Sequence, residues 1–92
     1  MTVAASRATG ALDRLHGALL ALDRGRRDAI VEVYDESVGP ALALALARTR
    51  GDRAAAEALL CRAYVEVRRR AGDYPRSGLR ALPWVLAITA RA

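Results

Sequence analysis

The apolar residues of this chain recur at three- and four-residue intervals, the spacing of one face of an α-helix. The first such stripe starts after Gly10 and consists of Leu12, Leu15, Leu19 and Leu22. Gly25 follows the stripe and predicts the end of this helix. Residues 1–9 are small and polar and lack an apolar stripe, so we expect a flexible N-terminus there and a helical domain over residues 10–92.

A second helix is expected from Asp28, an acidic residue that suits a helix cap or a first turn. Its apolar face consists of Ile30, Val31, Tyr34 and Val38. Pro40 interrupts this pattern, because proline lacks a backbone donor and disfavours helix at the residue before it. Residues 41–47 alternate alanine and leucine with the period of a strand, but both residue types favour helices. We therefore expect either one long helix kinked at Pro40 or two helices that meet there.

The third helix has the clearest pattern in the chain. It follows Gly51, and Asp52 is its expected cap. Its buried stripe consists of Ala56, Leu59, Leu60, Ala63, Tyr64 and Val67. On the outer face, Arg62 and Glu66 stand four residues apart and are expected to form an ion pair.

The segment after the third helix has two glycines and one proline in residues 72–78, which predicts a loop. A fourth helix is expected to begin between Leu79 and Pro83, because proline is tolerated in a first turn. Apolar residues lie nearly all round this helix, which indicates that it is largely buried. The sequence thus predicts an all-α fold, a small bundle of about four helices.

Composition excludes several classes of protein. A single cysteine, Cys61, cannot form an internal disulfide, and one cysteine with one histidine cannot make the usual four-ligand zinc site. We therefore expect no metal or other cofactor. No apolar run approaches the roughly 18 residues of a membrane span, and the first residues lack the layout of a signal peptide. These features predict a cytoplasmic protein without membrane insertion.

Residues suited to catalysis are also few. Neither His16 nor Cys61 has a nucleophile or a carboxylate at a spacing that indicates a catalytic pair. We expect His16 at the surface, and Cys61 as a small thiol packed beside the buried face of the third helix. The sequence also lacks the glycine-rich loops that bind phosphates. We therefore predict that the protein is not an enzyme.

The positive charges are all arginines, and they concentrate in the second half of the chain. Residues 1–47 contain five arginines and six acidic residues, a net charge of −1, whereas residues 48–92 contain ten arginines and four acidic residues, a net charge of +6. A basic half on a small helical protein indicates an anionic partner. The alternative is an ordinary solvated surface that happens to be rich in arginine.

An ordered series of motifs runs from Leu22 to the end of the chain. It consists of Arg24-Gly25 with Ile30 and Tyr34, Ala56-Glu57 with Tyr64, Tyr74-Pro75, and the run Trp84–Arg91. In this order and spacing, the series resembles region 2 of the extracytoplasmic-function (ECF) sigma factors, the promoter-melting domain of bacterial transcription initiation. The resemblance covers roughly residues 20–92.

The resemblance implies two binding surfaces and a regulatory partner. The outer face of the third helix would dock on the β′ subunit of core RNA polymerase through Glu57, Arg62, Glu66 and Arg69. The segment after that helix would hold an unpaired base of the −10 promoter element through Tyr74, Arg76, Ser77 and Arg80. Aromatic or arginine planes suit base stacking, and cations suit phosphates. Anti-sigma factors commonly mask such domains, so one is a further expected partner.

Departures from the family pattern leave a second function open. Ala58 stands where the family usually has an aspartate, and Cys61 where it has a glutamine. The chain could then be a sigma-like protein-interaction module, bound by an anti-sigma factor or other regulatory protein without promoter recognition. Tyr74 also has a second interpretation, as a loop anchor packed on Trp84, which itself is expected in the core. A helix-turn-helix protein is disfavoured, because the last helix is too apolar to be a recognition helix.

Overall fold

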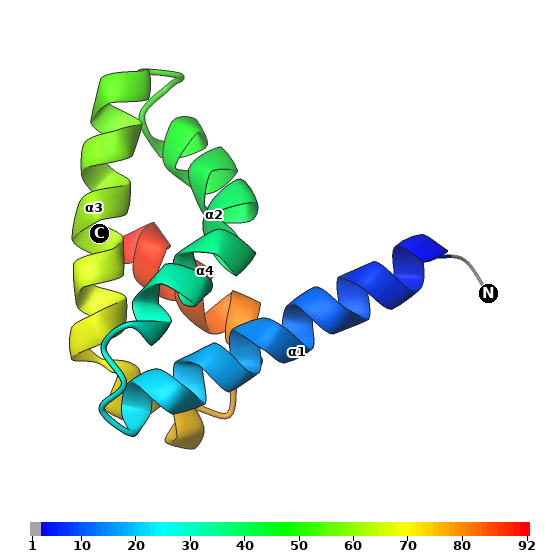
Figure 1. The fold of residues 1–92 in the computed structure, drawn as a ribbon. Coiled ribbons are helices and arrows are strands. Elements are labelled where there is room, and N and C mark those ends of the chain that lie inside the picture. Colours follow the sequence, from blue (N-terminus) through cyan, green and yellow to red (C-terminus); the bar gives the residue numbers. More distant parts are fainter. Residues whose placement is uncertain (1–2) are drawn as a thin grey trace.

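Helices make up nearly all of the chain (Figure 1). The computed structural model describes residues 3–92, with the side chains of residue 10 and residues 14–92. The elements in order are α1 (Val3–Asp23), α2 (Ala29–Arg48), α3 (Arg53–Arg69), the 3₁₀ helix η1 (Ala71–Arg76) and α4 (Ala81–Arg91). Residues 3–92 contain no strand. The predicted all-α bundle is therefore confirmed.

The four α-helices enclose one apolar core. In Figure 1, α2 and α3 run beside each other from the turn that joins them, and α4 lies behind them and contacts both. Helix α1 crosses the lower end of this pair and packs on α2 and η1. The largest apolar side chains that are fully buried are Leu15, Leu19, Val33, Val67 and Val85. None of the helices in the described part of the chain has the length and apolar character of a membrane span.

Helix α1 starts earlier than the predicted Gly10 and ends where predicted. The leucine stripe is buried at Leu15, Leu19 and Leu22. The side chain of Leu12, like those of residues 1–9, lies outside the described residues. The turn after α1 passes through Gly25 with φ +93°, a conformation that only glycine adopts without strain.

Helix α2 is one long helix that continues through Pro40, the first of the two expected alternatives. Of the apolar face predicted for it, Ile30 and Val38 are partly buried against the core, but Val31 and Tyr34 were wrong, because they are 63% and 44% exposed. The buried stripe of α2 instead consists of Val33, Ser37, Ala41 and Ala45. These residues are four apart and mostly small, so the helix backbone can approach its neighbours closely.

Helix α3 matches its prediction in every buried position. All six residues of the expected stripe are buried. The side chain of Asp52 caps the helix by accepting a hydrogen bond from the backbone nitrogen of Ala55 at 3.0 Å. Such a cap satisfies one of the backbone donors that the first turn leaves free.

A buried hydrogen bond joins α2 to α3. The hydroxyl of Ser37 donates to the backbone oxygen of Val33 at 2.6 Å, and its oxygen lies 2.7 Å from the hydroxyl of Tyr64. Because serine has only one hydroxyl proton, Tyr64 must be the donor in the second bond. Burial raises the pKa of Tyr64, so its phenol keeps this proton at neutral pH.

Removing either hydroxyl tests this bond. We expect Ser37→Ala to lower the free energy of unfolding by about 1–3 kcal/mol, because it leaves the Tyr64 hydroxyl buried without an acceptor. Tyr64→Phe should cost about 1 kcal/mol, because Ser37 keeps its bond to Val33. The double variant should lose less than the sum of the two, as measured by urea denaturation. Strictly additive losses would show that the two hydroxyls do not interact.

Candidate nucleic-acid interface

The connector between α3 and α4, residues 71–80, is more regular than predicted. We expected a loop over residues 72–78, but Ala71–Arg76 form the 3₁₀ helix η1. Its bonds span three residues, as from the nitrogen of Asp73 to the oxygen of Arg70 at 2.8 Å. Gly78, with φ +73°, then turns the chain towards α4. The backbone of the connector is therefore held by its own hydrogen bonds, and its exposed side chains extend from a defined conformation.

Tyr74 is the anchor of the connector. Its side chain is only 4% exposed. Its ring meets the Trp84 ring edge-on, with centroids 5.4 Å apart, and its hydroxyl lies 2.6 Å from Nδ1 of His16 on α1. His16 lies at the surface, as predicted. The expectation that Tyr74 stacks on a DNA base is corrected here, because its ring faces the core; the alternative of a loop anchor packed on Trp84 matches the geometry.

Ser77 is exposed, but its hydroxyl already has two partners within the connector. It donates to the backbone oxygen of Tyr74 at 2.8 Å and accepts from the backbone nitrogen of Leu79 at 3.1 Å. These bonds fix the turn that leads into α4. Ser77 therefore shapes the connector, and its proton is not free to bind a DNA base.

Arg76 and Arg80 are the two predicted DNA-binding residues that remain available. Both are exposed, and neither has an ion-pair partner among the residues that the structure describes. One guanidinium nitrogen of Arg76 donates to the backbone oxygen of Gly72 at 3.3 Å, which leaves its other donors free. Two free guanidinium groups on one short segment suit the phosphates of a nucleic acid strand.

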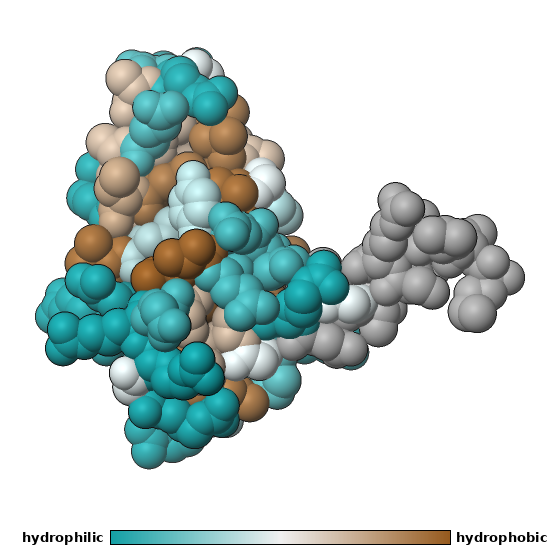
Figure 2. All heavy atoms as spheres, viewed as in Figure 1, coloured by the Kyte–Doolittle hydropathy of each residue, from teal (hydrophilic) through white to brown (hydrophobic). Residues whose placement is uncertain are grey.

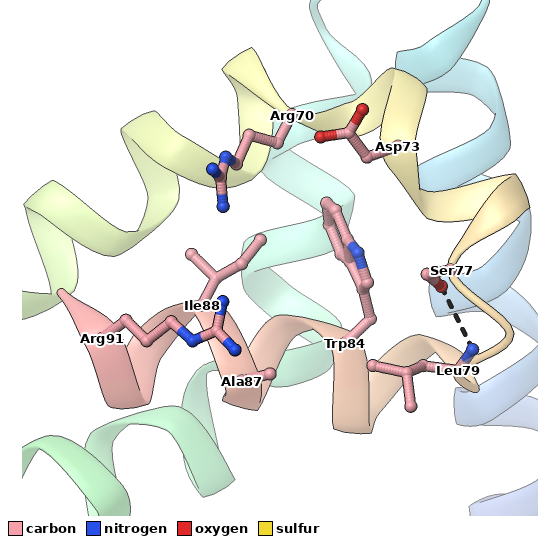
Figure 3. Close-up of a pocket in the computed structure, with 8 residues that line it drawn as sticks. All are labelled: Arg70, Asp73, Ser77, Leu79, Trp84, Ala87, Ile88 and Arg91. Carbon is pink, nitrogen blue, oxygen red and sulfur yellow. Dashed lines mark hydrogen bonds between the residues drawn. The ribbon is translucent and has the colours of Figure 1, made fainter.

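A pocket of about 210 Å³ lies beside the connector, between the end of α3 and α4 (Figure 3). The residues that line it are Arg70, Asp73, Ser77, Leu79, Trp84, Ala87, Ile88 and Arg91. In Figure 3 the guanidinium groups of Arg70 and Arg91 lie on one side, Asp73 and Ser77 lie on the other, and the indole of Trp84 stands between them. The pocket thus combines two cations and one carboxylate, Asp73, with flat and aliphatic apolar surface.

The predicted polymerase-binding residues are all at least partly exposed on α3, but they do not form one patch. Glu57 and Glu66 are nine residues apart, which turns them about 180° from each other around the helix. Arg62 and Arg69 lie between them on the Glu66 side. Glu57 pairs with Arg53 instead, at 3.1 Å. The structure therefore brings three of the four residues together and separates Glu57.

The expected ion pair between Arg62 and Glu66 is not formed. Glu66 binds Arg69 at 2.6 Å and also approaches Arg70 at 3.6 Å. These pairs lie on the surface and stabilise the fold little. They leave Arg62 exposed without an acidic partner among the described residues, so its guanidinium group is available to an anionic partner.

Cys61 differs from its prediction, because it is exposed and not packed. It lines a shallow hollow of about 450 Å³ together with Arg62, Val65, Glu66 and Ala92. Val65 is 48% exposed at this position. Within the described residues, no cluster of three or more histidine, cysteine or acidic side chains is placed to bind a metal ion.

Hydrophilic surface covers the lower end of the bundle on the face that Figure 2 shows. Figure 2 shows hydrophilic atoms gathered over the loop between α1 and α2 and the end of α3, and apolar atoms over the middle of α2. The basic connector joins α3 at this lower end. A polar, arginine-rich surface of this kind suits an anionic partner better than an apolar one.

Sequence reasoning considered Arg70 only as part of the run Arg68–Arg70, which would steer DNA or complement the helix end, and it did not consider Arg91 as a binding residue. Arg70 and Arg91 are 21 positions apart in the sequence and meet only because α4 packs against α3. The run Arg68–Arg70 and the motif Trp84–Arg91 were both visible in the sequence, but nothing in it showed that they share a pocket.

Comparison of the chain with protein-family models, curated proteins and solved structures finds no match.

Proposed function

We propose that this chain is a sigma-factor region 2 domain of the ECF type, acting in transcription initiation. In this proposal the outer face of α3 binds core RNA polymerase, and the connector with its neighbouring pocket binds the unpaired strand of a −10 promoter element. An anti-sigma factor is the expected regulatory partner. The domain carries out no chemistry of its own.

One observation carries this proposal: four exposed arginines lie on the connector and at the pocket beside it, and of these only Arg70 has an ion-pair partner among the described residues, Glu66 at 3.6 Å. Arg76 and Arg80 project from the connector, and Arg70 and Arg91 line the pocket beside it. Single-stranded nucleic acid binds to sites that combine a basic track with flat apolar surface. The all-α fold and the order of its helices are compatible with the family resemblance.

Binding of a fluorescein-labelled single-stranded oligonucleotide with a −10-like sequence, followed by anisotropy, tests the proposal. If the four arginines each contact a phosphate, log Kd should change with log salt by a slope of about 2.8. Raising salt from about 50 to about 200 mM should then weaken binding about 50-fold. The double variant Arg76→Ala/Arg80→Ala should reduce the slope by about 1.4.

The matched control is the double variant Arg50→Ala/Arg53→Ala, which removes the same charge from the far end of α3. It should leave both the affinity and the salt slope nearly unchanged. Equal weakening by the two double variants, or equal binding to a scrambled oligonucleotide, would contradict promoter recognition. Either result would instead indicate unspecific attraction between the basic half and any polyanion.

The second candidate function is a sigma-like module that binds protein and not promoter DNA. The contacts of Tyr74 and Ser77 favour it, because both residues are occupied within the protein. Co-purification with core RNA polymerase separates the two candidates when it is combined with the oligonucleotide assay. Polymerase binding that Arg62→Glu abolishes, without any preference for the −10 sequence, would select the second candidate.

A further inference from the structure

Trp84 has a buried ring, but the N–H group of its indole has no hydrogen-bond partner among the described residues. Its side chain is 6% exposed and lines the pocket beside the connector. Within the described part of the chain its indole nitrogen has no hydrogen-bond partner. No completely buried side-chain nitrogen or oxygen in that part lacks a partner, so the indole nitrogen keeps some accessible surface, and Trp84 is a residue that lines the pocket. Trp84 thus adds one fixed donor to a pocket whose other polar side chains are Arg70, Asp73, Ser77 and Arg91.

The other polar groups of the connector cannot serve in this way. The hydroxyl of Tyr74 faces His16, away from the pocket, and the proton of Ser77 is bound to a backbone oxygen. Arg70 and Arg91 extend from the other side of the pocket in Figure 3, and such long cationic side chains suit phosphates. The indole N–H is therefore the rigid donor in the pocket that can select a neutral group.

A fixed hydrogen-bond donor in a small pocket favours ligands that carry an acceptor over ligands that lack one. A ligand that brings a carbonyl oxygen or a ring nitrogen gives the N–H an acceptor, whereas one that lacks an acceptor leaves the donor unpaired. The aliphatic side chains of Ile88 and Leu79 also line the pocket and can contact the faces of a flat ring. An unstacked nucleobase has both the flat ring and the acceptors.

We propose that Trp84 is a specificity-determining residue, whose indole N–H donates a hydrogen bond to an acceptor of the nucleobase held in this pocket. The inference rests on the proposed function, since it takes the ligand to be a single strand of DNA. It replaces Tyr74 and Ser77, the predicted base-contacting residues, with a residue that was expected only in the core. Arg70 and Arg91 bind the flanking phosphates.

Two probes of equal shape test the inference. One is a short oligothymidylate, and the other is the same oligonucleotide in which difluorotoluene, a thymine-shaped ring without strong acceptors, replaces each base. The wild-type protein should bind oligothymidylate about threefold to tenfold more tightly, the effect of one hydrogen bond. Trp84→Phe should bind both probes equally, whereas the control Tyr34→Phe, on the outer face of α2, should keep the wild-type preference.

The intrinsic fluorescence of the wild-type protein gives a second measurement that needs no variant. Trp84 is the only tryptophan, so its emission reports on this pocket alone. Oligothymidylate should quench it, and an abasic oligonucleotide of equal length should not. A thymine preference that Trp84→Phe retains, or unchanged emission on binding, would overturn the inference while the proposed function stands. Equal binding of oligothymidylate, its isostere and the abasic strand would overturn both.

Discussion

Replacing Trp84 by alanine is expected to cost about 3–5 kcal/mol of stability, which is the usual effect of deleting a buried aromatic side chain. The ring is 6% exposed and meets Tyr74 edge-on, so it holds α4 against the connector. A domain of this length has a total stability of about 5–14 kcal/mol. The variant should therefore lose a large share of its stability and populate unfolded chains well below the wild-type denaturation midpoint.

Urea denaturation followed by far-ultraviolet circular dichroism measures this loss, because the variant has no tryptophan to give a fluorescence signal. Trp84→Phe is the matched control: it keeps an aromatic ring in the same position and should cost clearly less. If both variants had wild-type midpoints, the packing of Trp84 against Tyr74 would contribute little to the fold.

Tyr74→Ala is expected to destabilise the domain by about 3 kcal/mol or more, since Tyr74 is buried and bonded to His16 across the molecule. Tyr74→Phe should cost only about 1 kcal/mol, because the ring contacts remain and the exposed His16 can bind water instead. Urea denaturation of both variants, with oligonucleotide anisotropy on the folded protein, distinguishes an anchor from a DNA contact. A Tyr74→Ala variant with wild-type stability but no DNA binding would identify a surface stacking residue.

Helices α3 and α2 show why sequence patterns predict some faces and not others. The buried stripe of α3 contains leucine, valine and tyrosine, whose burial the hydrophobic effect strongly favours, so the spacing alone identified it. The buried stripe of α2 contains Ser37, Ala41 and Ala45, whereas the more apolar Val31 and Tyr34 remain exposed. Small residues are buried in α2 because they let the helix pack closely on its neighbours. A pattern of hydropathy alone cannot predict this, because it ranks residues by polarity and not by size.

The candidate site was predictable in its location and not in its contacts. The glycines and arginines of the connector identified the segment, and Arg76 and Arg80 are exposed there as expected. The sequence could not decide whether Tyr74 faces a ligand or the core, because an aromatic residue suits both places. It also could not place Arg91 on the same side of the pocket as Arg70, since that proximity depends on the packing of α4 against α3.

The alanines of α2 have a consequence for how this domain can change over evolutionary time. Ala41 and Ala45 are fully buried in a helix that touches α1, α3 and α4. A larger side chain at either position would push α2 away from the helices that it contacts. This shift would also lengthen the hydrogen bond between Ser37 and Tyr64. These two positions should tolerate glycine or serine at most, whereas the exposed Val31 of the same helix is free to vary.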